Sequence, residues 1–302
     1  MGLPAMKAVR GRFPSSRITA VVGSATEEIV NLAGVFDDVI AVDRVRLLRG
    51  NKFASSVEMI KFAFSIRRKR FDFVIDLHSL PETNLLGYFS SARLRLFSKR
   101  ESRSLDRLSN FDPQPPAEDK TTHLSQYYLD VLLPLGVAGK PETFLFEKLD
   151  GSERPTKAVV GINPGAGNPS RRWPVENFIE LARRIIDSGK ADIEVLIGPE
   201  DGALADAFEK ALPQKCTINT GVGLRHLIAS LQRFTLIVSN DTGPAHIAAA
   251  CGAPIVLLRH TASPDRYLPL ANDLIVHRGD DLADIKVDGV YASVLELLGE
   301  TG

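Results

Sequence analysis

The sequence predicts an α/β protein built from two Rossmann-like lobes. Short β-branched segments alternate with longer amphipathic segments along the whole chain, and this alternation is typical of βαβ units with parallel sheets. With 302 residues, of which 44% are hydrophobic, the chain can form two cores of roughly 150 residues each. A polar, proline-containing segment, residues 148–157, separates the halves. We therefore expect a first domain over residues 1–150 and a second over 151–302.

The individual elements follow from local patterns. Six apolar runs predict strands, at residues 18–22, 71–77, 158–162, 193–198, 235–239 and 254–258. The pattern from Pro4 to Arg12 indicates a helix ahead of the first run, so the first lobe lacks its leading strand: either its sheet begins with a helix or residues are missing upstream. Residues 175–187 predict an amphipathic helix that Gly189 ends, with Pro174 at its first position. The proline-rich residues 110–119 predict a surface loop.

Composition excludes several classes of protein. The 37 basic and 37 acidic side chains cancel, so no overall field attracts nucleic acid. Residues 44–107 hold 15 Lys/Arg and 6 Asp/Glu, a net charge of 15 − 6 = +9, which suits an anionic acceptor, a membrane surface or simply solvated helix faces. Cys216 and Cys251 lack disulfide or metal spacing and fit a reducing compartment. No segment approaches the about 18 apolar residues of a membrane span, so we expect a soluble, cytoplasmic protein. We expect no metal and no cofactor.

The first motif that carries chemistry follows the strand at 158–162. It is a glycine-rich loop that contains Gly165 and Ala166 and continues to Arg171 and Arg172 before the next helix. Such a loop lets backbone N–H groups approach an anion, and guanidinium groups match phosphate oxygens. The motif predicts a diphosphate site, although an ordinary strand-to-helix turn with two surface arginines fits the spacing equally well.

The second motif, residues 239–246, follows the strand at 235–239 and opens a helix predicted over Pro244–Cys251. It places Asp241, Thr242, Gly243 and His246 where parallel sheets bind ligands. Asp241 would accept hydrogen bonds from sugar hydroxyls or backbone N–H groups, and His246 would donate to a phosphate oxygen. For Asp241 a plain helix-capping role remains open.

The first lobe offers weaker candidates. Asp76, His78 and Ser79 follow the strand at 71–77 and could face an acceptor sugar, or they could merely cap the next helix. The basic run at residues 67–70 closes a helix, where the negative end of the helix dipole favours cations.

At these motifs the sequence resembles glycosyltransferase family 9, the ADP-heptose:lipopolysaccharide heptosyltransferases. The most specific matches are residues 163–166 with 171–174 and residues 239–246 with 248–250; residues 3–14 and 70–77 match more weakly. The resemblance implies the GT-B fold, two Rossmann-like lobes with a cleft between them, in which the second lobe binds the nucleotide-sugar and the first binds the acceptor. It also implies inverting, metal-independent transfer of heptose from ADP-heptose to the lipopolysaccharide core.

The resemblance extends to single residues. The family's Asp-Thr-Gly-x-x-His element falls on Asp241, Thr242, Gly243 and His246, which implies contacts to the donor. The family's lysine before Trp-Pro falls on Arg171, and the preceding loop contact falls on Gly165 and Ala166. On the acceptor side, Asp76 and His78 are the candidates.

One departure concerns the catalytic base. Family members begin with a strand and a Gly-Asp pair, whose aspartate is regarded as the base, and this element would lie upstream of Leu3. We expect a misplaced start codon or a fragment, and the catalytic residue is unknown. The alternatives are another GT-B nucleotide-sugar transferase, or a non-catalytic nucleotide-sugar binder or inactive fragment. The expected partners are ADP-heptose, the lipopolysaccharide core precursor and, peripherally, the inner face of the plasma membrane, with no nucleic acid.

Overall fold

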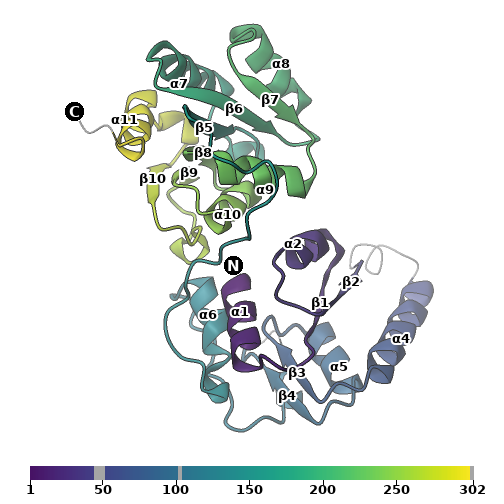
Figure 1. The fold of residues 1–302 in the computed structure, drawn as a ribbon. Coiled ribbons are helices and arrows are strands. Elements are labelled where there is room, and N and C mark those ends of the chain that lie inside the picture. The colour runs from purple at the N-terminus through teal and green to yellow at the C-terminus, as the bar shows by residue number, and fades with distance from the viewer. Residues whose placement is uncertain (44–51, 101–103, 300–302) are drawn as a thin grey trace. The chain divides into compact units, whose positions relative to one another are not determined.

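Strands and helices alternate along the chain and divide it into two units, Met1–Glu142 and Thr143–Gly302 (Figure 1). The structure is a computed structural model that describes residues 1–43, 52–100 and 104–299. Within these ranges, none of the helices combines the length and the apolar character that crossing a bilayer requires.

The division between the units falls earlier than the predicted position near residue 151, because the segment after Glu142 packs on the second unit. The Phe146 N–H donates to the Ala250 carbonyl at 2.8 Å. The Leu149 N–H donates to Oε1 of the buried Gln232 at 3.0 Å. These bonds fix the connecting segment to the unit that follows it.

The first unit begins with a helix, as the sequence predicts. Its helices and strands are α1 (Leu3–Arg12), β1 (Thr19–Gly23), α2 (Glu27–Leu32), β2 (Asp38–Val42), α4 (Lys52–Arg68), β3 (Phe73–Asp76), α5 (Pro81–Phe89), β4 (Leu94–Phe97) and α6 (Leu124–Asp130). Within the described residues, β1 pairs with β2 and β3 pairs with β4, each in parallel, as separate two-stranded sheets. Helix α1 packs on α6 around the buried Ala5 and Tyr127. Residues 110–119 form neither helix nor strand, which confirms the predicted loop.

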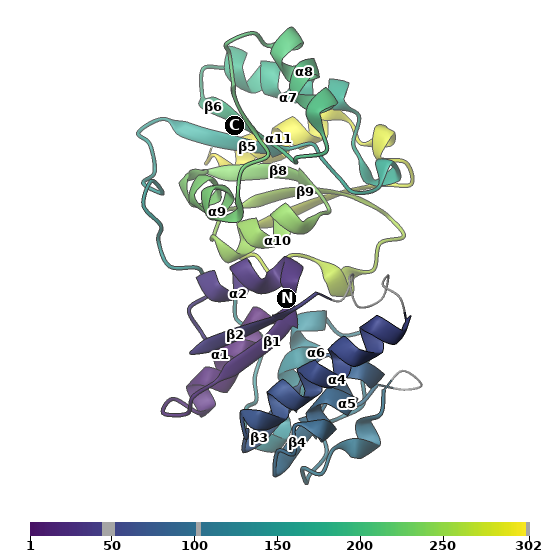
Figure 2. The same cartoon turned by 90° about the vertical axis from the view of Figure 1, so that its right-hand side faces the viewer.

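The second unit is a doubly wound α/β sheet. Its elements are β5 (Ala158–Asn163), α7 (Val175–Asp187), β6 (Ala191–Ile197), α8 (Gly202–Ala211), β7 (Thr217–Thr220), α9 (Leu224–Arg233), β8 (Leu236–Asn240), α10 (Gly243–Ala250), β9 (Ile255–His260), β10 (Leu274–Gly279) and α11 (Val287–Leu297). The six parallel strands have the order β10-β9-β8-β5-β6-β7. Helices α7 and α8 lie on one face of the sheet and α9 and α10 on the other (Figure 2).

The helix predicted over residues 175–187 is confirmed with those bounds. Its Phe178, Leu181 and Ile185 are fully buried against the sheet, and Gly189 adopts a φ of 71° just after its end. Pro174 lies one residue before the helix instead of at its first position, because its ψ of 136° is extended. The helix predicted from Pro244 begins one residue earlier, at Gly243.

The strand order of the second unit reverses direction between β5 and β8. From β5 the chain winds outward through β6 to β7, then returns to place β8 on the other side of β5. Ligands of open α/β sheets bind at such a reversal, outside the carboxyl ends of the strands. The reversal between β5 and β8 is therefore the place where a ligand of the second unit is expected.

Candidate functional site

Two asparagines join the loops that follow β5 and β8. Asn163, the last residue of β5, donates through Nδ2 to Thr242 Oγ1 at 3.0 Å and to Ser239 Oγ at 2.9 Å. Asn240, the last residue of β8, is fully buried: its Nδ2 donates to the Pro164 carbonyl at 2.9 Å, and its Oδ1 accepts from the Trp173 N–H at 3.0 Å. The predicted motifs therefore meet at one edge of the sheet, held together by side chains that sequence reasoning had not assigned to the site.

The loop after β5 is shaped by a contact with Asp201, which lies between β6 and α8. A Cβ on Gly165 would lie 2.6 Å from Asp201 Oδ2, so only glycine fits without movement. Arg172 pairs with Asp201 Oδ1 at 2.8 Å and donates to the carbonyl of the buried Ala166 through Nε and Nη2. The Arg172 guanidinium thus fixes the loop, which makes it a structural group.

Arg171 differs from its neighbour. It ends a short 3₁₀ turn, Pro169–Arg171, whose start is capped by the Asn168 side chain. The Arg171 side chain is exposed and makes no hydrogen bond or ion pair with any residue in the described ranges. Of the two adjacent arginines, Arg171 is the one whose fork is available to an anion.

The loop after β8 presents the second group of predicted residues. Thr242 is the N-cap of α10. The Asp241 side chain therefore does not have the helix-capping role that the sequence left open. Gly243 is exposed in the first turn of α10, and His246 is half-buried one turn into the helix. The amino end of α10 thus faces the edge where β5 also ends, and its dipole favours an anion there.

Asp241 pairs with a buried arginine that the sequence did not reveal. Arg259, on β9, is 1% exposed, and its Nε lies 3.3 Å from Asp241 Oδ2. Burial lowers the pKa of the Arg259 guanidinium from its usual value, while the Asp241 carboxylate acts in the opposite direction. Asp265 lies 3.5 Å from the same guanidinium and pairs more closely with Arg278, at 2.7 Å.

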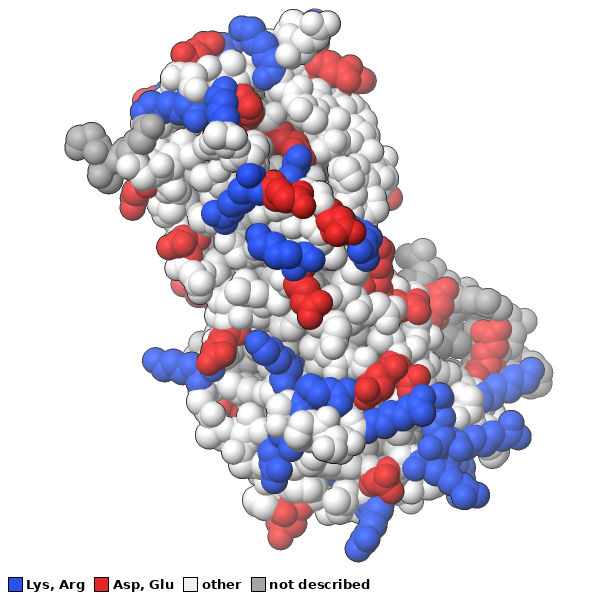
Figure 3. Space-filling model, viewed as in Figure 1, with Lys and Arg blue, Asp and Glu red and all other residues white. Residues whose placement is uncertain are grey.

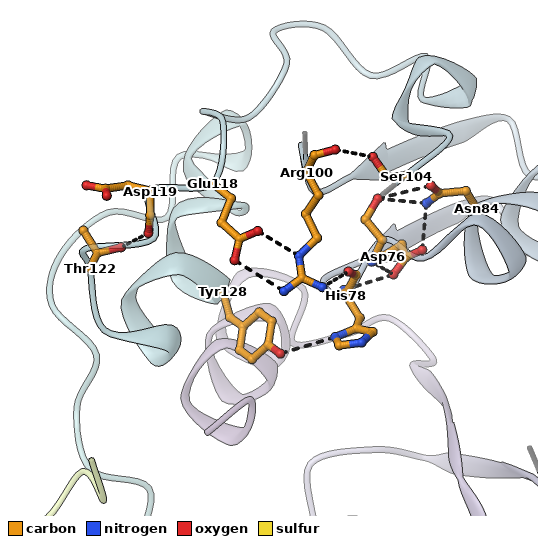
Figure 4. A network of polar contacts seen from close by, with 10 residues as sticks. Asp76, His78, Asn84, Arg100, Ser104, Glu118, Asp119, Thr122 and Tyr128 are labelled. Carbon is orange, nitrogen blue, oxygen red and sulfur yellow. Dashed lines mark hydrogen bonds and ion pairs between the residues drawn. The ribbon is translucent and has the colours of Figure 1, made fainter. Parts of the chain in front are cut away.

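The acceptor-side candidate Asp76 has a structural task in the first unit (Figure 4). Its Oδ1 accepts from the N–H groups of His78 and Ser79, and its Oδ2 accepts from Thr83 Oγ1 and Asn84 Nδ2. A carboxylate has about four acceptor positions, so these donors saturate it. Asp76 holds the turn between β3 and α5 through backbone N–H groups that precede the helix. It accepts no backbone N–H of α5, whose N-cap is Leu80, so its role differs from the helix cap that the sequence left open.

His78 is exposed at that turn and is oriented by its neighbours (Figure 4). Tyr128 Oη lies 3.4 Å from its Nδ1. Arg100 donates to the His78 carbonyl at 3.0 Å and pairs with Glu118 at 3.1 Å. Tyr128 contacts the ring and Arg100 fixes the backbone of the turn, so His78 remains the acceptor-side candidate.

The structure therefore gathers the predicted donor residues at one sheet edge of the second unit, and it places Asp76 and His78 at a strand end of the first. Within the described ranges, no group of three or more His, Cys, Asp or Glu side chains is arranged to hold a metal ion. The residues that sequence reasoning missed, Asn163, Asn240, Asp201 and Arg259, share one signal: each is a polar residue at or just beyond the carboxyl end of an apolar strand.

The chain is similar in sequence to known glycosyltransferases. The profile of glycosyltransferase family 9 (heptosyltransferase) matches residues 59–287. Lipooligosaccharide heptosyltransferase 2 of Haemophilus influenzae is 30% identical over 160 residues, which cover 49% of this chain and 45% of that protein. Lipopolysaccharide heptosyltransferase 2 of Escherichia coli is 34% identical over 134 residues, covering 42% and 37%. The chain thus matches less than half of the length of these relatives.

Solved structures resemble the whole chain. A glycosyl transferase family 9 protein from Veillonella parvula has a TM-score of 0.82 at 24% identity, covering 99% of this chain and 93% of that one. The E. coli heptosyltransferase WaaC, solved with ADP, has a TM-score of 0.77 at 19% identity, covering 98% and 95%. This likeness confirms the expected α/β fold of the GT-B type.

Proposed function

The chain belongs to glycosyltransferase family 9, and on this premise we propose that it transfers heptose from ADP-heptose to the lipopolysaccharide core with inversion at the transferred carbon. The observation that carries the proposal is the strand reversal between β5 and β8, where Arg171 stands unpaired among the described residues beside two loops joined by Asn163 and Asn240. A diphosphate needs such a combination of backbone amides and a guanidinium fork.

In the proposed reaction an acceptor hydroxyl attacks the anomeric carbon of the heptose. The bond between that carbon and the β-phosphate oxygen breaks, ADP leaves with the bonding electrons, and a base takes the hydroxyl proton. Arg171 and His246 stabilise the charge that develops on the diphosphate, and the amino end of α10 adds its dipole. The Asp241 carboxylate accepts hydrogen bonds from heptose hydroxyls, and His78 contacts the acceptor. We assign no described residue as the base.

Nucleotide titration tests the donor assignment. By calorimetry, we expect ADP to bind at least about tenfold more tightly than UDP or GDP, as a base-reading site discriminates through a few hydrogen bonds. Tightest binding of UDP or GDP would refute ADP-heptose as donor and favour another nucleotide-sugar transferase. Binding of ADP-heptose without release of ADP in the presence of the lipopolysaccharide core precursor would favour a non-catalytic binder.

We also propose that the protein works in the cytoplasm and docks on the inner face of the plasma membrane through its first unit. Lys and Arg side chains gather over this unit on the face drawn in Figure 3. Helices α4 and α5 contact each other and carry exposed large apolar side chains: Met59, Ile60, Phe64, Leu85, Tyr88 and Phe89. Arg67 and Arg68 are exposed at the end of α4. Arg44, Arg46, Arg49 and Arg103 of the predicted basic region lie outside the described residues.

Exposed apolar groups next to basic ones suit an anionic bilayer, because each Lys or Arg adds about 1 kcal/mol near such a surface and each buried apolar side chain adds about 1.5–3 kcal/mol. We expect the protein to sediment with vesicles of 70% phosphatidylcholine and 30% phosphatidylglycerol. The double variant Ile60→Glu/Phe64→Glu should bind at least about tenfold more weakly, since both side chains are more than half exposed and lie one turn apart.

The matched control is Tyr267→Glu, which replaces a comparably exposed apolar side chain of the second unit and should leave vesicle binding unchanged. Equal binding of the wild-type protein to pure phosphatidylcholine, or equal loss in both variants, would contradict docking through the first unit.

A further inference from the structure

Arg259 occupies an unusual position for an arginine. It lies on the inner strand β9, its side chain is 1% exposed, and its Nε has no hydrogen-bond partner among the described residues. Burying a guanidinium is unfavourable unless the charge is paired and hydrogen-bonded. Arg259 lies near the carboxyl edge of the sheet, beside the predicted donor loops, so we ask which neighbouring carboxylate pairs with its buried charge.

Asp241 is the partner that the geometry favours. β8 and β9 are neighbouring parallel strands, and the Asp241 N–H donates to the Leu258 carbonyl, one residue before Arg259. Asp265, the other nearby carboxylate, is 69% exposed and pairs more closely with Arg278. The Asp241 side chain is 18% exposed, so its charge and that of Arg259 meet largely away from water.

We propose that Arg259 positions the Asp241 carboxylate for the donor sugar and offsets its negative charge beside the diphosphate. This inference rests on the proposed function of the site and adds to it a positioning residue.

The electrostatic argument is direct. A lone carboxylate at the mouth of a diphosphate site would repel the ligand that the site has to bind. A guanidinium behind the carboxylate makes the pair nearly neutral as seen from the ligand. Asp241 Oδ2 faces Arg259 at 3.3 Å, whereas Oδ1 accepts no hydrogen bond from the described residues. One oxygen is thereby fixed and the other is presented to sugar hydroxyls.

A double-mutant cycle that removes each charge in turn tests the inference, with ADP as the probe at pH 8, where carboxylates are ionised. Arg259→Met leaves the Asp241 carboxylate uncompensated, so the Kd for ADP should rise at least about tenfold. Asp241→Asn should change the Kd for ADP by less than about threefold, because ADP lacks the sugar. The double variant Arg259→Met/Asp241→Asn should return to within about threefold of wild type.

Rescue in the double variant is the result that a merely structural role for Arg259 would not give. Equal weakening in Arg259→Met and in the double variant would overturn the inference, as would an unchanged Kd in Arg259→Met. If Arg259→Met fails to fold, Arg259→Gln is introduced into the wild-type protein and into Asp241→Asn, and the same two Kd values for ADP are compared. Arg278→Met is the control, because Arg278 pairs with Asp265 but not with Asp241. Absence of ADP binding in the wild-type protein would instead refute the proposed function.

Discussion

Substitution of Arg171 by alanine is expected to lower the turnover of heptosyl transfer by about 100-fold. The Arg171 guanidinium belongs to the predicted diphosphate loop and is unpaired among the described residues, and removal of one donor from a developing anion typically costs about 10²–10³ in rate. Because the side chain is exposed and forms no hydrogen bond or ion pair with the described residues, the melting temperature should remain that of wild type. Arg171→Lys, which keeps the charge without the fork, should recover part of the loss.

The measurement is release of ADP from ADP-heptose in the presence of the core precursor, with kcat and KM determined separately. Arg183→Ala is the matched control, because Arg183 is an exposed arginine of α7 that pairs only with Glu180 among the described residues. Its kcat should stay within about twofold of wild type. Wild-type kinetics in Arg171→Ala would remove Arg171 from the diphosphate site.

Substitution of Asn240 by alanine is expected to lower the free energy of unfolding by about 2–5 kcal/mol. The change leaves two buried backbone groups without a partner, the Trp173 N–H and the Pro164 carbonyl, and each unsatisfied group costs about 1–3 kcal/mol. These groups belong to the loop that carries Arg171. We therefore expect the affinity for ADP to fall together with stability.

Urea unfolding followed by circular dichroism measures the effect. Asn272→Ala, which removes only an exposed hydrogen bond to Thr143 in the same unit, should change the free energy of unfolding by less than about 0.5 kcal/mol. A loss of similar size in both variants, or wild-type stability in Asn240→Ala, would show that the loop is held in another way.

The sequence was a good guide to the central elements. All six predicted strands exist, because buried parallel strands are continuous apolar runs that stand out from their surroundings. Four strands of the described residues were missed: β2, β4, β7 and β10. β7 has the polar sequence TINT at a sheet edge, and β4 is four residues long and contains Arg95. Short or edge strands need little apolar surface, so they lack the signal on which the prediction depends.

The site was predictable only in part. Glycines and strand ends identified both donor loops, since their roles depend on the local backbone. The partners of individual side chains did not follow, because they are far apart in the chain: Asn240 bonds across to Pro164, and Arg172 pairs with Asp201. For the same reason the loop pattern predicted one common role for Arg171 and Arg172, whereas the structure separates them.

That separation has an evolutionary consequence. Loss of Arg172 would release the loop, whereas loss of Arg171 would, on the proposed function, affect the chemistry and leave the fold intact. Replacement of Arg171 could therefore adapt the proposed site to a different leaving group, and the fraction of folded protein would be unaffected. Two neighbouring residues thus separate stability from the proposed chemistry, so a change at Arg171 would meet no stability threshold.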